Sequence, residues 1–127
     1  MPLVRISHVS GKPASLATKL ARGVHRDGGD VQISRRQRFQ IVTSHEGPGG
    51  IVGPNEFLGM AHPADLVFIQ ITCADGRSVD QKKALSAAIA GRLSQDTGVR
   101  SEEVITNLME TRRGNWSLGH GLAPLAN

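Results

Sequence analysis

The chain has 127 residues and a net charge of +4, with eleven arginines against four lysines. This length is typical of one domain with a modest core. The composition argues against several classes of protein. No apolar run approaches the roughly 20 residues of a membrane span, the first residues do not resemble a signal peptide, and a single cysteine, Cys73, excludes an internal disulfide. We therefore expect a soluble, cytoplasmic protein.

Arginine favours planar, bidentate contact with carboxylates, so the excess of arginine fits a small acidic substrate. The only dense basic run is Arg35-Arg36-Gln37-Arg38. Nucleic-acid binding needs an extended basic face, usually with aromatic or groove-reading elements, so a solvated turn before a strand is the favoured explanation of this run. We expect neither a nucleic-acid partner nor a membrane.

The first part of the chain predicts a β-α-β unit. Residues Leu3–Val9 have the pattern of a strand, and the turn at Ser10–Pro13 is typical of a helix start. Apolar residues then recur every four positions, which predicts a helix with one buried face. Its stripe is Leu16, Leu20 and Val24. A second strand is predicted at Phe39–Thr43. Residues 46–64 are rich in glycine and proline and form a long connector, with a short strand or turn around Ile51–Val52 and Phe57–Met60.

The same pattern then repeats. Leu66–Thr72 is the most strand-like run in the chain, because branched and aromatic residues dominate it. Ser78 and Gln81 match a capping box, which predicts that a helix begins just after Arg77. The predicted buried stripe of this helix is Leu85, Ala88, Ile89 and Leu93, with Gly98 closing the helix. Glu103–Met109 is the fourth main strand.

These elements predict a single α+β domain over residues 1–127, with one unit at about 1–45 and a second at about 65–127. Two fused β-α-β units would form one four-stranded mixed sheet with both helices on one face. The other face would be exposed unless subunits cover it, so we expect a homo-oligomer. A small ferredoxin-like binding module has the same order of elements and remains the alternative. The repeat also predicts that the strand at residue 66 starts opposite the start of the first strand.

Pro2 directly follows the initiator methionine. Removal of Met1 would leave a proline with a free secondary amine, and no side chain offers that chemistry. A normal α-amino group has a pKa of about 7.7–8.0, and burial in an apolar pocket lowers it. Such an amine can act as a general base or acid near neutral pH. Many proteins carry proline at this position without a catalytic role, so Pro2 alone does not decide the function.

Arg77 follows the strongest strand and precedes the predicted helix cap. The guanidinium and the N–H groups of the first helical turn would together form an anion site, although a surface arginine in a loop fits the same position.

Trp116 could line an apolar pocket near the amine or contact another subunit. The five histidines, among them His25, lack the spacing of metal ligands, and Cys73 is expected to be a buried apolar residue.

Four segments together resemble the tautomerase superfamily, in particular the branch that includes malonate semialdehyde decarboxylase. They are Met1-Pro2-Leu3-Val4, Arg38-Phe39-Gln40-Ile41-Val42, Asp75-Gly76-Arg77-Ser78 with Gln81-Lys82, and Asn115 to Gly121. The resemblance implies two fused β-α-β units, a homotrimer, no cofactor, a catalytic Pro2, and an Arg77 that binds the substrate carboxylate.

The chain departs from that branch at two positions. Gln37 stands where the decarboxylases have an aspartate that assists catalysis, and Asp75 stands where some have a second arginine. The chain also lacks tyrosine, which argues against a dehalogenase. We therefore predict a tautomerase of small 2-oxo acids or enols that uses Pro2, with Arg77, Gln37 and Trp116 contacting the substrate. Decarboxylation of a 3-oxo acid such as malonate semialdehyde is the alternative.

Overall fold

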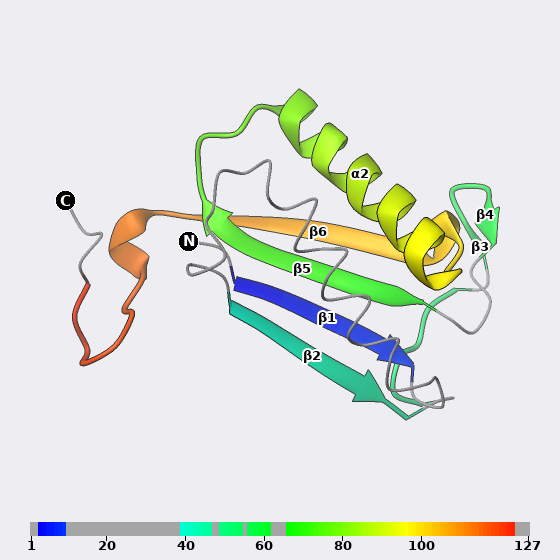
Figure 1. Ribbon diagram of the computed structural model, residues 1–127, viewed down its shortest axis with the longest axis horizontal. Coiled ribbons are helices and arrows are strands. Elements are labelled where there is room, and N and C mark those ends of the chain that lie inside the picture. Colours follow the sequence, from blue (N-terminus) through cyan, green and yellow to red (C-terminus); the bar gives the residue numbers. More distant parts are fainter. Residues whose placement is uncertain (1–2, 10–38, 47–48, 55, 62–65, 124–127) are drawn as a thin grey trace.

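A computed structural model describes residues 3–9, 39–46, 49–54, 56–61 and 66–123 of the chain. Its main element is a four-stranded sheet in the order β2-β1-β5-β6 (Figure 1). The strands are β1 (Leu3–Val9), β2 (Phe39–His45), β5 (Val67–Ala74) and β6 (Val104–Thr111). The helix α2 (Val79–Thr97) joins β5 to β6, followed by a 3-10 turn at Ser101–Glu103. The predicted first crossover helix lies outside the described residues.

The sheet consists of two parallel strand pairs joined antiparallel. β1 runs parallel to β2 from the Leu3–Phe39 pair onward, and β5 runs parallel to β6 from the Val67–Val104 pair onward. β1 and β5 run antiparallel between them. This confirms the predicted mixed sheet. It also contradicts the ferredoxin-like alternative, in which a strand of the other unit splits each β-α-β unit, whereas here the strands of each unit pair directly.

The core lies between α2 and one face of the sheet. Every second residue of β5 is buried, as expected of a strand with one face toward a core. The helix contributes Leu85, Ile89 and Leu93, which lie one above another at intervals of four residues. Ala88 was predicted in this stripe, but it is exposed. Its position is roughly 100° around the helix from the centre of that row, since each residue advances by about 100°.

The helix begins and ends as the sequence predicts. The Ser78 hydroxyl accepts the backbone N–H of Gln81 at 3.1 Å, and the Gln81 side chain accepts the backbone N–H of Ser78 at 2.9 Å. These two bonds form the predicted capping box. Gly98 adopts a φ of 76° at the other end, a left-handed conformation that glycine tolerates well. The start of α2, and with it the position of Arg77 beside the helix, is therefore fixed by local sequence.

The face of the sheet opposite α2 carries exposed apolar side chains. Phe39, Ile41 and Met109 point to this face and are 54%, 43% and 45% exposed. No element among the described residues covers them. A short hairpin in the connector pairs β3 (Glu56–Phe57) with β4 (Met60–Ala61), as predicted around Phe57–Met60, whereas Ile51–Val52 forms no strand. No helix in the described part of the chain is both long and apolar enough to cross a membrane.

Candidate functional site

Two of the four predicted site residues, Arg77 and Trp116, lie in the described part of the chain, at one end of the sheet. Leu3 of β1 pairs with Thr72 near the end of β5, and Ala74, which ends β5, pairs with Thr111, which ends β6. The start of the first strand therefore lies beside the end of β5. The sequence prediction that the two starts lie opposite each other is wrong, because β1 and β5 pair antiparallel. The actual arrangement places Arg77, which follows β5, at the edge where β1 begins.

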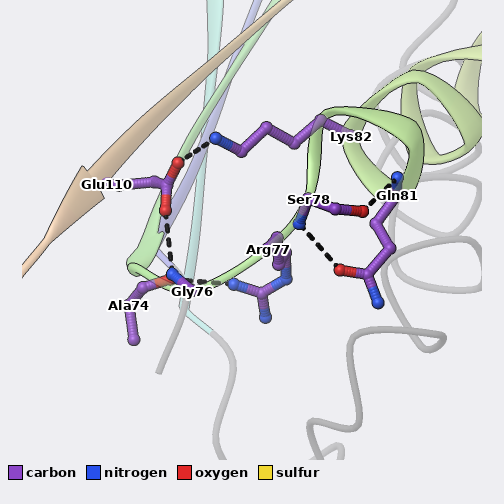
Figure 2. Close-up of polar contacts among 7 residues, drawn as sticks. All are labelled: Ala74, Gly76, Arg77, Ser78, Gln81, Lys82 and Glu110. Atoms are coloured by element: carbon purple, nitrogen blue, oxygen red, sulfur yellow. Dashed lines mark hydrogen bonds and ion pairs between the residues drawn. The ribbon is translucent and has the colours of Figure 1, made fainter.

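The loop between β5 and α2 is held by hydrogen bonds along its backbone (Figure 2). The Asp75 N–H donates to the Thr111 carbonyl oxygen at 3.2 Å, and the Gly76 N–H donates to Glu110 Oε2 at 3.1 Å. Gly76 has a φ of 118°, a backbone conformation that residues with a side chain rarely adopt. The loop therefore has one defined path from the strand to the helix cap.

Arg77 is half-buried at the end of this loop. Its Nη1 donates to the carbonyl oxygen of Ala74 at 2.9 Å, so the side chain folds back toward the end of β5. A guanidinium carries five N–H donors, and no carboxylate among the described residues forms an ion pair with it. Arg77 thus keeps its positive charge and further donors close to the first turn of α2, whose own N–H groups favour anions.

The structure adds two residues that the sequence did not single out as site residues. Glu110 extends from β6 toward α2, where its second oxygen, Oε1, accepts a hydrogen bond from Lys82 Nζ. This bond, assisted by the Gly76 N–H, holds the pKa of Glu110 below its usual value. Lys82 belongs to the motif at residues 75–82. Glu110 is 28 residues away from it, and only the register of β6 against β5 would have indicated the pairing.

Cys73 lies beside this cluster, directly across from Glu110 in the sheet. The thiol is only 2% exposed, which confirms the prediction of a buried apolar residue. Burial raises the pKa of the Cys73 thiol, and the positive charge of Arg77 acts in the opposite direction. A thiol in this state is poorly suited to act as a nucleophile, because the thiolate is the reactive form.

Trp116 also lies at this end of the sheet. It follows a 3-10 turn at Arg113–Asn115, and its indole Nε1 donates to the Thr111 hydroxyl at 2.8 Å. Because Thr111 ends β6, the half-buried indole lies at the edge where Arg77 lies. Pro2, Gln37 and His25 lie outside the described residues, so the structure brings together two of the four predicted site residues.

Comparisons with known proteins agree with this arrangement. The family profile described as "Tautomerase enzyme" matches residues 37–119. The probable tautomerase YusQ of Bacillus subtilis (strain 168) is 30% identical, over 98% of each chain. The solved structure of FG41 malonate semialdehyde decarboxylase inhibited by 3-bromopropiolate is 30% identical, with a TM-score of 0.87 over 95% of this chain and 92% of that chain.

A more distant structure shares the fold alone. The symmetric trimer of wild-type fused 4-OT (the Q0 form) is 18% identical, with a TM-score of 0.78 over 98% of this chain and 97% of that chain. The matching profile covers more than half of the present chain, and the 30% identical relatives cover nearly all of it. The chain therefore belongs to the tautomerase superfamily of enzymes, in the branch that resembles malonate semialdehyde decarboxylase.

Proposed function

We propose that the protein is a cofactor-independent tautomerase that interconverts small 2-oxo acids and their enols. The observation that carries this proposal is Arg77. It presents a guanidinium without an acidic partner among the described residues, at the sheet edge where the first strand begins. Pro2 directly precedes Leu3 in the sequence, which supports its role as the acid–base group at this edge.

In the proposed reaction, the amine of Pro2 removes a proton from the carbon next to the carbonyl group. A carbon–carbon double bond forms, and the carbonyl π electrons move to oxygen, which gives an enolate. Arg77 binds the carboxylate and offsets the charge that develops on that oxygen. Transfer of that proton from the protonated Pro2 amine to the oxygen completes the enol and restores the neutral amine, and the reverse sequence returns the keto acid. Trp116 would line the apolar side of the pocket and Gln37 would contact the substrate.

Decarboxylation of a 3-oxo acid is the second candidate, because the solved relative with a TM-score of 0.87 is a malonate semialdehyde decarboxylase. That reaction needs a cation at the substrate carbonyl, for which a protonated Pro2 would serve. A nearby carboxylate stabilises a protonated amine, and Gln37 cannot supply that negative charge. We therefore expect proton transfer at carbon to be faster than loss of carbon dioxide.

We further propose that the protein forms a homotrimer. Phe39, Ile41 and Met109 are exposed on the sheet face opposite α2, and oligomers commonly cover such apolar surface. The symmetric trimer of fused 4-OT, which has the same fold, supports this proposal.

Turnover of a panel of enol and 3-oxo acids tests the proposed function. Intact mass should first show loss of Met1. Pro2→Ala should abolish most tautomerase activity, and Arg77→Ala should lower kcat/KM by about a hundredfold, since it removes a charge-assisted contact to a desolvated carboxylate. Arg100→Ala, at the far edge of the sheet, is the matched control and should leave kcat/KM unchanged in the folded protein. Faster decarboxylation than tautomerisation, or full activity in Arg77→Ala, would contradict the assignment.

A further inference from the structure

Glu110 connects three elements around Arg77. Glu110 belongs to β6. Its Oε2 accepts a hydrogen bond from the N–H of Gly76 in the loop, and its Oε1 accepts one from the ammonium of Lys82 in α2 (Figure 2). The carboxylate thus connects the strand to the loop and to the helix, through one residue before Arg77 and one residue after it. Neither acceptor oxygen is shared between the two partners, so each bond fixes a separate element.

The space on the side of Gly76 where a side chain would lie is open. A Cβ placed on Gly76 would meet no atom within 4 Å. Gly76 also has the conformational freedom of glycine, which a rigid loop must restrict by other means. The hydrogen bond to Glu110 is the contact that fixes the Gly76 amide, one residue before Arg77.

The Lys82–Glu110 pair is poorly placed to stabilise the fold. The side chains of the two residues are 33% and 25% exposed, and ion pairs within reach of solvent contribute little to the free energy of unfolding. Their contact instead links the start of α2 to the penultimate residue of β6. The loop that carries Arg77 runs between this part of the sheet and the start of α2.

We propose that Glu110 is a positioning residue, which clamps the Ala74–Ser78 loop between β6 and α2 and so sets where Arg77 presents its guanidinium to the substrate carboxylate. This inference rests on the proposed function, in which Arg77 binds that carboxylate. Glu110 does not itself touch the substrate. Its removal should therefore weaken substrate binding more than it slows the chemical step.

The test compares Glu110→Ala, Glu110→Gln and Lys82→Met by steady-state kinetics with an enol acid and by thermal unfolding. Glu110→Ala should raise KM about tenfold with kcat within about threefold, because a small misplacement of a binding group weakens binding strongly. Glu110→Gln keeps an acceptor for the Gly76 N–H and should restore much of the binding. Lys82→Met leaves the bond between Glu110 and Gly76 and should have the smallest effect. Glu102→Ala, an exposed acid at the opposite end of β6, is the matched control.

The Arg77→Ala background separates this inference from the proposed function. If Glu110 acts through Arg77, Glu110→Ala should have no further effect on KM once Arg77 is gone. A tenfold rise in KM that persists in that background, or a wild-type KM in Glu110→Ala, overturns the positioning role of Glu110. Neither result affects the proposed role of Arg77 in binding the carboxylate. Full activity in Arg77→Ala alone overturns the proposed function. Should Glu110→Ala fail to fold, Glu110→Gln and hydrogen exchange of the Gly76 amide give the answer. A raised KM in Glu110→Gln or Lys82→Met would contradict the clamp if the Gly76 amide exchanged at the wild-type rate in both variants.

Discussion

Arg77 and Arg100 lie at opposite ends of the β5–β6 pair and differ in their ion pairs with carboxylates among the described residues. Arg100 precedes β6, where its Nε contacts Glu103 Oε1 at 3.0 Å and its Nη2 lies 3.7 Å from Glu102 Oε2. Arg77 follows β5 and donates to a backbone carbonyl. The charge of Arg100 is thus balanced within the chain, whereas that of Arg77 remains available to a ligand. An arginine paired with a buried carboxylate supports the fold, and one without such a partner can serve a site.

The largest expected effect on stability is at Arg100. Glu103 is only 4% exposed, and Arg100→Ala would leave its carboxylate without this charged partner. We expect the free energy of unfolding to fall by about 2 kcal/mol, the cost of a buried group that loses its partner. Urea denaturation measures this loss, and kcat/KM should stay at the wild-type value.

Glu102→Ala separates burial from charge at that same end of the sheet. Glu102 and Arg100 are about half exposed at their contact, so removal of Glu102 should change stability by less than about 0.5 kcal/mol. Equal losses in Glu102→Ala and Arg100→Ala would show that burial of Glu103 does not matter and would weaken the contrast between the two ends.

A loss of stability between those of Arg100→Ala and Glu102→Ala is expected at Gly76. Gly76→Ala puts a side chain on a residue with a φ of 118°, although the space around it is open. The strain should cost about 1 kcal/mol of unfolding free energy, and kcat/KM should fall because Arg77 is the next residue. Gly91→Ala is the matched control, since Gly91 has the same open space but lies within α2. There alanine should stabilise the protein by up to about 1 kcal/mol. Similar shifts in both variants would contradict a conformational role for Gly76.

The contrast between the two ends also shows what the sequence can predict. The bounds of β1 and the start of α2 follow from local pattern, because alternation and a capping box act over a few neighbouring residues. The pairing of Lys82 with Glu110 depends on the register of β6 against β5, two strands that α2 separates in the sequence. The antiparallel junction of β1 with β5 is equally non-local, and no residue in either strand encodes its direction. The sequence therefore predicted Arg77 and Trp116 as candidates, but not the acid that holds the loop.

The smallest expected effect concerns pH and the same carboxylate. The hydrogen bond from Lys82, assisted by the Gly76 N–H, lowers the pKa of Glu110 in the folded protein relative to the unfolded chain. A depressed carboxyl pKa contributes stability that is present above the unfolded pKa, about 4.3, and is lost as pH falls through the folded pKa. The difference in unfolding free energy between the wild type and Glu110→Gln should therefore be constant near neutral pH and shrink below about pH 4.

Urea denaturation followed by the fluorescence of Trp116, the only tryptophan in the chain, measures this difference directly. Addition of about 1 M salt should reduce it as well, because the Debye length falls to about 3 Å and the pair is partly exposed. Glu102→Gln, at the other end of β6, is the matched control for the effect of salt, since Arg100 lies 3.7 Å from Glu102 in a half-exposed pair. A difference that grows as the solution is acidified would mean that the carboxylate of Glu110 destabilises the fold, and the clamp around Arg77 would then have no electrostatic basis.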